Sequence, residues 1–196
     1  MNFKDSETCK NLMRAFAGES QARNRYTFAA SVAKKNNLYV VEAVFDYTAG
    51  QEKEHAEVFY NLLNECAGET IHIDGGYPVD LSNNVEELLR MAQHNEYEEH
   101  SDAYPAFAAK AKEEGFENIA NIFSKIADIE KTHGDRFGRL AEELKSGKMF
   151  MSDSETKWMC LNCGHVLNSK GVPEVCPVCQ HDKGYFIRME FSPYEN

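Results

Sequence analysis

Side chains that commonly bind metal ions recur at helical spacing within residues 1–147 of this chain. Glu52 and His55 stand three positions apart, and Glu130 and His133 repeat that pair 78 residues later. Residues three apart in a helix lie on the same face, so each pair can approach one metal ion. The candidate ligands are Glu19, Glu52, His55, Glu96, Glu99, Glu130 and His133.

These seven residues occupy helical stripes where Leu or Phe would normally pack, and no lysine shares the stripes. Burying an ionised carboxylate without compensation costs many kcal/mol, so buried carboxylates are paired or bind metal. A single Glu-x-x-His on a helix is usually a solvated face, but here it occurs twice at matching positions. Two such pairs, with a Glu from each of two other helices, form the ligand pattern of di-iron helical bundles. Oxygen-rich ligation with two imidazoles suits iron or manganese better than zinc or copper.

Two tyrosines obey the same 78-residue offset, Tyr26 and Tyr104. Their symmetric placement beside candidate ligands predicts hydrogen bonds from their hydroxyls to the carboxylates. Packing in the core is the alternative role for a tyrosine on such a stripe, and the sequence leaves both open.

A second candidate metal site lies near the end of the sequence, where two Cys-x-x-Cys pairs are separated by twelve residues. This spacing is typical of a tetrahedral four-thiolate site formed by Cys160, Cys163, Cys176 and Cys179. Spacing alone does not distinguish iron from zinc. A neighbouring di-iron site favours iron, because zinc is redox-inert and would supply it with no electrons. Cys9 and Cys66 have no partner at ligand spacing and are interpreted as ordinary buried or partly buried thiols.

The elements that must position these ligands are four long amphipathic helices. Apolar residues recur at steps of three and four, which is typical of the seam of a left-handed bundle. The second half repeats the first, so the sequence predicts two helical hairpins joined by a Gly-rich crossover at 67–83. The predicted helices cover residues 6–35, 38–66, 84–114 and 116–145.

One residue breaks the symmetry of the repeat. Glu19 lies seven positions before Tyr26, whereas Glu96 lies eight before Tyr104. An extra residue in a helix usually forms a π-bulge, a feature common near functional sites. The third helix is nevertheless expected to keep one inward stripe, with Ala103 and Ala106 continuing it.

Charge and hydropathy exclude several classes of function. Lys and Arg number 21 against 32 Asp and Glu, a net charge of -11. Nucleic acids and anionic membranes both require a basic face, so neither is expected as a partner. The first ten residues lack the apolar core of a secretory signal, and no apolar run approaches the ~20 residues of a membrane span. With six cysteines and no export signal, we expect a cytoplasmic protein in a reducing compartment.

Several segments together resemble the rubrerythrin family. They are AFAGESQARNRYTF (15–28), EKEHA (52–56), NEYEEHSDAYPAFA (95–108), EKTH (130–133) and the cysteine module. The resemblance covers essentially the whole chain and implies an all-α ferritin-like four-helix bundle at 1–147. A small β-rich rubredoxin-like metal ribbon, with a mononuclear iron, is implied at 148–196.

The activity implied by the resemblance is the reduction of hydrogen peroxide to water in oxidative-stress defence. Electrons would originate in NAD(P)H, arrive through rubredoxin or an NAD(P)H-dependent reductase, and pass through the rubredoxin-like iron. Two further iron ions would form the carboxylate-bridged site, and zinc is a possible substitute in either site. The expected assembly is a homo-oligomer, with a dimer as its size.

The resemblance also implies a role for each ligand. Glu52 and Glu130 would bridge the ions, Glu19 and Glu99 would bind one, and Glu96 and His133 the other. On reduction the first ion would exchange Glu99 for His55. Gln180, where rubredoxins typically have Gly, leaves the knuckle geometry in question. His100 replaces a common Trp outside the ligand set.

Two alternatives remain at this stage. The first is a ferritin-like ferroxidase that oxidises Fe(II) for storage, for which six ligands suffice. Two features favour the peroxidase instead. Both Glu96 and Glu99 are predicted to face inward, which makes a seventh ligand candidate, and the four-cysteine module is fused to the bundle. The second is a structural protein with zinc in both sites, which leaves the seven buried ligands with no redox role.

Overall fold

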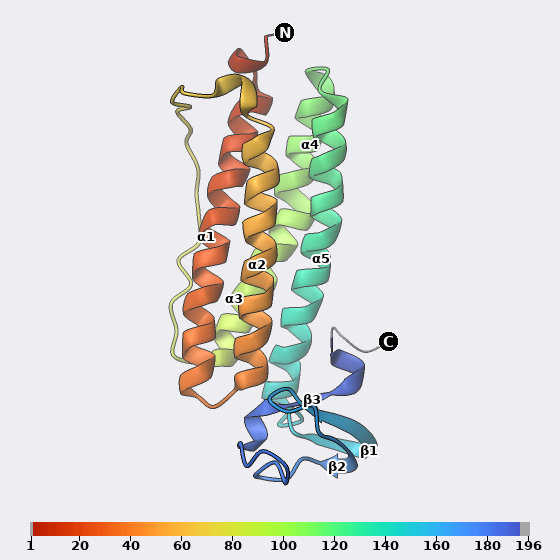
Figure 1. Ribbon diagram of the computed structural model, residues 1–196. Coiled ribbons are helices and arrows are strands. Elements are labelled where there is room, and N and C mark those ends of the chain that lie inside the picture. Colours follow the sequence, from red (N-terminus) through yellow and green to blue (C-terminus); the bar gives the residue numbers. More distant parts are fainter. Residues whose placement is uncertain (1, 193–196) are drawn as a thin grey trace.

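The computed structural model describes residues 2–192 of the chain and shows a helical bundle with a small sheet at one end (Figure 1). A 3₁₀ turn at Phe3–Asp5 precedes the first helix. The helices of the bundle are α1 (Glu7–Lys35), α2 (Tyr39–Asn61), α3 (Val85–Glu98), α4 (Tyr104–Glu113) and α5 (Glu117–Lys145). α3 and α4 form one continuous rod, because a π-helical turn at Glu99–Ala103 joins them.

The helix ends follow from local capping. The Ser6 hydroxyl accepts the backbone N–H of Cys9 at the start of α1. Asn84 accepts the N–H groups of Glu86 and Glu87 at the start of α3. Such caps satisfy donors that have no partner inside the helix. The second helix ends earlier than predicted, at Asn61, and a 3₁₀ turn at Asn64–Cys66 replaces its expected last turn.

The predicted π-bulge is confirmed, and it corrects the stripe expected beyond it. Ala103 is only half-buried and Ala106 is exposed, whereas Tyr104 and Ala108 are buried. The extra residue in the wide turn rotates the inward face by one position. Tyr104 therefore faces the interior, as Tyr26 does on α1.

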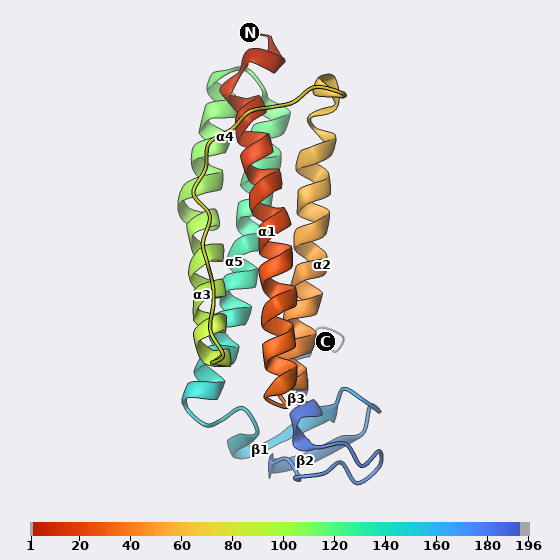
Figure 2. The same cartoon turned by 90° about the vertical axis from the view of Figure 1, so that its left-hand side faces the viewer.

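The crossover 67–83 has no regular structure and returns the length of the bundle, outside α1 and the α3–α4 rod (Figure 2). Ion pairs hold it in place: Arg14 Nη2 lies 2.7 Å from Asp74 Oδ1, and Arg25 Nε lies 3.2 Å from Asp80 Oδ2. The Tyr77 hydroxyl donates to the Arg14 carbonyl oxygen at 3.1 Å.

The apolar core is divided into two clusters, and the candidate ligands lie between them along each helix. The cluster near the sheet includes Val41, Phe45, Leu89, Phe137 and Leu140. The cluster at the other end includes Leu12, Phe59, Leu63, Phe123 and Ile126. The buried charges thus lie in a band across the middle of the bundle, closed at both ends by apolar side chains.

The sheet contains β1 (Met151–Cys160), β2 (Val166–Gly171) and β3 (Phe186–Arg188), in the antiparallel order β2-β1-β3. Its core is formed by Trp158, Cys160, Cys176 and Phe186. It packs against the bundle end where α1 turns into α2 and α5 ends (Figure 1). The rings of Tyr39 and Tyr185 stack at 4.1 Å, and Arg188 Nη2 lies 3.2 Å from Glu143 Oε2.

The backbone of the sheet region comes close to the bundle at Gly184, in the 3₁₀ turn Lys183–Tyr185, where a Cβ atom would lie 1.9 Å from the Asn37 carbonyl oxygen. Gly184→Ala should therefore push the two parts apart and lower the free energy of unfolding by about 1–3 kcal/mol, the usual cost of overpacking. Thermal unfolding followed by circular dichroism measures this. Gly50→Ala is the control, since nothing lies within 4 Å of its Cβ position and alanine favours α2. Equal stability of Gly184→Ala and the parent would contradict the contact.

Candidate metal centres

The acidic side chains form two groups that share members. Glu19, Glu52, His55 and Glu130 bring four potential ligand atoms within 4.8 Å of one another, and Glu52, Glu96, Glu130 and His133 do the same. Glu52 and Glu130 belong to both groups. Two carboxylates common to two neighbouring groups is the arrangement expected of bridging ligands in a two-metal site.

Each helix contributes to the site according to the repeat. Glu19 lies on α1 and Glu96 on α3, while α2 and α5 each carry a Glu-His pair. All six are buried; five are at most 1% exposed, and His55 is 7% exposed. Water therefore does not screen these charges.

The two histidines occupy equivalent places. His133 Nδ1 lies 2.8 Å from both Glu52 Oε1 and Glu130 Oε2. His55 Nδ1 lies 3.0 Å from Glu130 Oε1 and 3.1 Å from Glu52 Oε2. The rings are nearly parallel, with centroids 5.6 Å apart. Each bridging candidate thus has one oxygen directed toward each imidazole.

The electrostatics show that the cluster requires positive charge. Burial raises the pKa of Glu19 and of Glu96 well above the usual range, and neighbouring carboxylates raise both further. Burial disfavours the charged form of His133, yet the close carboxylates of Glu130 and Glu52 outweigh it and raise its pKa. Protons therefore balance the carboxylates unless a metal cation does so.

The donor atoms themselves fit a pair of metal ions. Within residues 2–192, several buried oxygens and nitrogens of the cluster have no hydrogen-bond partner. Buried polar atoms are nearly always satisfied, so such a concentration of exceptions requires an explanation. Hard cations such as iron take this mixture of carboxylate oxygen and imidazole nitrogen. The atoms are Glu19 Oε2, Glu52 Oε1, Glu96 Oε2, both Glu130 oxygens and both His133 ring nitrogens.

The two tyrosines lie directly behind the ligands. The Tyr26 hydroxyl donates to Glu96 Oε1, and the Tyr104 hydroxyl donates to Glu19 Oε1. Both tyrosines are 2% exposed. Each hydroxyl occupies one carboxylate oxygen and leaves the other, which has no partner, directed at the cluster.

Glu99 lies beside the cluster but in neither group of four. It begins the π-helical turn, and burial together with Glu96 raises its pKa well above the usual range. It also lines a cavity of about 600 Å³, together with Gly18, Tyr77 and Tyr104. Residues 74–78 of the crossover form part of its wall.

Arg25 was not among the sequence candidates, although the structure places it in the wall of this cavity. It pairs with Asp80 of the crossover, and its charge offsets a small part of the rise in the pKa of Glu99 that burial and the neighbouring carboxylates cause. The sequence offered one indication of its position: Arg25 immediately precedes Tyr26, which lies on the inward stripe. The position of Tyr77 could not be predicted, because the crossover has no period.

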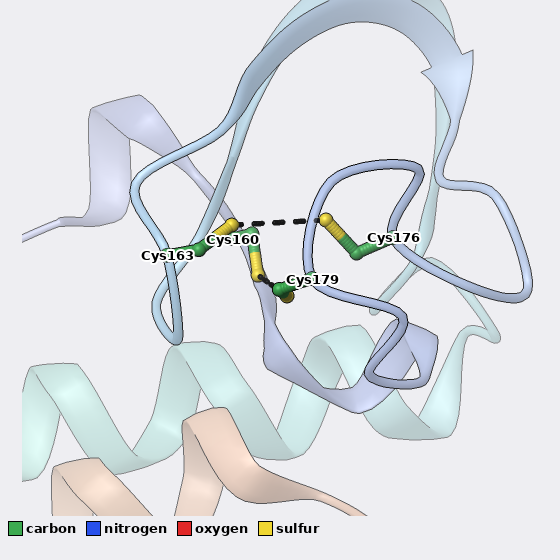
Figure 3. A group of neighbouring side chains, drawn as sticks. All are labelled: Cys160, Cys163, Cys176 and Cys179. Carbon is green, nitrogen blue, oxygen red and sulfur yellow. Dashed lines mark hydrogen bonds between the residues drawn. The ribbon is translucent and has the colours of Figure 1, made fainter.

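The four predicted cysteines converge in the sheet region, as two pairs of neighbouring sulfurs (Figure 3). Cys160 Sγ lies 3.8 Å from Cys179 Sγ, and Cys163 Sγ lies 3.8 Å from Cys176 Sγ. Backbone N–H groups around Cys179, led by that of His181, lower the pKa of its thiol to about 6. A thiol that ionises readily is suited to metal binding.

The two knuckles have the same backbone form. Gly164 N–H donates to the Cys160 carbonyl, and Gln180 N–H donates to the Cys176 carbonyl. Gly164 has φ 76° and Gln180 has φ 62°. The knuckle therefore keeps its left-handed residue even though Gln180 is not glycine, at the small energetic cost of a side chain in that region.

Comparisons with known proteins agree with both sites. A family model described as rubrerythrin matches residues 10–141, and one described as the rubredoxin-like domain of rubrerythrin matches 158–187. Rubrerythrin of Porphyromonas gingivalis is 45% identical over 189 residues, covering 96% of this chain and 93% of that protein. Rubrerythrin of Nitratidesulfovibrio vulgaris is 40% identical and covers 94% of this chain and 95% of its own length.

Solved structures show the same fold. Fully reduced, all-ferrous nigerythrin has a TM-score of 0.63 at 28% identity, covering 94% of this chain and 90% of that one. Desulfovibrio desulfuricans bacterioferritin has a TM-score of 0.65 at 22% identity over 76% of this chain and 86% of that one, which shows the ferritin-like fold alone. The predicted fold class is confirmed. Across residues 2–192, no helix has the length and apolarity to span a membrane.

A candidate di-iron carboxylate site in the bundle and a four-cysteine rubredoxin-like site in the sheet are thus both present. Their donor sets are consistent with iron. Together with the family matches over both parts and the curated relatives over nearly the full length, they show that the chain belongs to the rubrerythrin family.

Proposed function

We propose that this protein is a peroxidase that reduces hydrogen peroxide to water through the carboxylate site, as part of oxidative-stress defence in the cytoplasm. The observation that carries the proposal is one chain holding both a buried Glu-His cluster and a four-cysteine redox module. A storage ferroxidase has no need of the second site. The working domains are proposed as 1–147 and 148–196; residues 193–196 lie outside the described part of the chain.

Each proposed metal site would be held by its own set of side chains. Glu52 and Glu130 would bridge two iron ions, with Glu19, His55, Glu96 and His133 as terminal ligands and Glu99 as the ligand that exchanges with His55. Cys160, Cys163, Cys176 and Cys179 would hold the mononuclear iron. When bound, these metals supply the two electrons that cleave the O–O bond and the relay that replaces them.

The rest of the site positions and protects this chemistry. Tyr26 and Tyr104 hold one oxygen each of Glu96 and Glu19, which fixes the orientation of both carboxylates. The cavity under the crossover gives a small oxidant a route to Glu99. The apolar clusters above and below exclude bulk water from the buried charges. The electrons are proposed to come from NAD(P)H through rubredoxin or an NAD(P)H-dependent reductase.

Ferroxidase activity is the second candidate, because the bacterioferritin fold is the same. Stopped-flow oxidation of the chemically reduced protein decides between them. The peroxidase proposal expects hydrogen peroxide to oxidise the reduced site faster than O₂ does. Faster reaction with O₂, followed by uptake of further Fe(II), would favour the ferroxidase instead.

Metal content should distinguish shared from single ligands. Glu130 belongs to both groups, so Glu130→Ala should lose both ions of the carboxylate site, whereas Glu19→Ala should retain one. Iron per chain, measured by elemental analysis, tests this. Glu54→Ala is the control, because Glu54 lies on the exposed face of α2. Equal iron loss in the Glu130 and Glu19 variants would show that Glu130 is not a ligand shared by the two groups.

Glu99→Ala should have a different effect, because Glu99 lies outside both groups of four. The reduced protein should retain two ferrous ions, while the oxidised form should lose iron or re-reduce slowly. Iron analysis in both redox states measures the difference. Glu98→Ala is the matched control, since Glu98 lines the same cavity but is exposed. Loss of an ion from reduced Glu99→Ala would refute the ligand exchange.

A further inference from the structure

A pair of buried thiols lies at the end of the bundle away from the sheet, where α1 begins and the turn after α2 ends (Figure 1). Cys9 Sγ and Cys66 Sγ are 3.5 Å apart, although 57 residues separate them in the sequence. We propose that these thiols close to a disulfide when the protein meets excess hydrogen peroxide. The inference concerns a part of the bundle that takes no part in the metal sites.

The geometry requires only a small movement. A disulfide has an S–S distance of about 2.05 Å, so the sulfurs must approach by roughly 1.5 Å. Cys9 is held in the first turn of α1, where its N–H donates to the Ser6 hydroxyl at 3.0 Å. Cys66 ends a three-residue 3₁₀ turn and begins the irregular crossover. The Cys66 side can therefore adjust without disturbing a long helix.

The cavity beside the pair indicates which thiol reacts with the oxidant first. Cys66 lines a cavity of about 200 Å³ with Met13, Tyr60 and Gly68, whereas Cys9 is not part of its wall. Cys9 is 1% exposed, and burial, followed by the contact with Cys66, raises its pKa to about 12. Cys9 is therefore the resolving thiol, shielded from peroxide and adjacent to the sulfur that reacts.

The reaction balances with peroxide as the only oxidant. The Cys66 sulfur attacks one peroxide oxygen; the O–O bond breaks, a sulfenic acid forms, and one water leaves. The Cys9 thiol then attacks the sulfenic sulfur, so that the S–S bond forms and the oxygen leaves as a second water. Two thiols are oxidised by two electrons, and one hydrogen peroxide is reduced to two waters.

The structure gives less support to a metal site at this pair of thiols than to a disulfide. Within residues 2–192, neither sulfur belongs to a group of three or more potential ligands. The disulfide, by contrast, would have a structural effect: it would join the helix carrying Glu19 to the turn that follows the helix carrying Glu52 and His55. Closing so long a loop constrains the unfolded chain, so thermal unfolding of the oxidised protein should occur at higher temperature.

The test uses the full-length, metal-loaded protein treated with excess hydrogen peroxide, then unfolded in a thiol-alkylating reagent and mapped by peptide mass spectrometry. A Cys9–Cys66 linked peptide, lighter by two hydrogens than its parts, is expected. In Cys9→Ser a sulfenic-acid probe should label Cys66, and in Cys66→Ser the Cys9 thiol should stay reduced. Oxidation of Met151, which is 54% exposed, verifies within each sample that peroxide acted.

Three results would overturn the proposal. Alkylation of both thiols in a sample whose Met151 is oxidised would show that the pair does not close. Linkage of either residue to a cysteine of the sheet would show that the pairing is wrong. Labelling of Cys9 in Cys66→Ser at the rate seen for Cys66 in Cys9→Ser would reverse the proposed order.

Discussion

Cys176→Ser should abolish peroxide turnover driven by the natural donor, while the chemically reduced protein still consumes peroxide. Cys176 is fully buried in the small core around Trp158, and its sulfur lies 3.8 Å from that of Cys163. A serine hydroxyl is a poor ligand for a site that selects its metal by soft thiolates. The relay would therefore be lost, and the carboxylate site, in a separate part of the chain, would remain.

The two assays separate the roles of the two sites. Turnover is measured as donor oxidation under peroxide, and the direct reaction as single-turnover oxidation of dithionite-reduced protein. Cys66→Ser is the matched control, because it makes the same substitution in the bundle. Loss of the metal can also unfold so small a module. A parent protein loaded with zinc at the four thiolates keeps the module folded but redox-inert, and it should show the same pattern. Turnover of Cys176→Ser at the parent rate would remove the relay from the mechanism.

Much of the bundle could be predicted from the sequence because its determinants are local. The predicted helices at 6–35 and 116–145 differ from α1 and α5 by one residue at their starts. The apolar stripes predicted which face of each helix points inward, and the Glu and His residues on those stripes predicted the candidate metal cluster. The extra residue before Tyr104 gave the π-helical turn, but not its consequence for Ala103 and Ala106, which depends on the rotation of the helix after it.

The features that escaped prediction depend on contacts between distant segments. The crossover has no period, so neither its path over the bundle nor the cavity beneath it could be derived. Cys9 and Cys66 were predicted to be buried or partly buried thiols, and both are buried, at 1% and 6% exposure. Their contact was missed, although an available signal would have found it. They lie almost equally far from the turn at 36–38, and antiparallel hairpins bring such positions together.

The position of the sheet bears on how the two metal sites communicate. The module packs on the end of its own bundle, through Tyr185 on Tyr39 and Arg188 on Glu143. Twelve residues of α5 separate His133 from the end of that helix, a rise of about 18 Å. The apolar cluster containing Phe45 and Phe137 fills the intervening core. A module held there does not contact the carboxylate cluster of its own chain.

A second chain can remove that separation. In a head-to-tail homodimer, the symmetry that brings one module to the partner's bundle also brings the partner's module back. Exposed apolar side chains on the bundle and on the cysteine loops, such as Phe28 at 66% and Val178 at 63%, are available for such contacts. The working unit is therefore proposed to be a homodimer in which each module serves the other chain's carboxylate site.

Mixing two inactive variants should then restore activity. Cys176→Ser retains its carboxylate site, and Glu130→Ala retains its module, so a mixed dimer contains one complete pathway between chains. Random exchange makes half of the dimers mixed, and the recovered donor-driven turnover should be about a quarter of the parent value per chain. Native mass spectrometry verifies that exchange has occurred.

A double variant carrying both substitutions, mixed with the parent chain, gives the matched control, since its mixed dimers have no pathway between chains. Transfer within one chain predicts the reverse: no recovery in the first mixture despite proven exchange, and full parent-chain activity in the second.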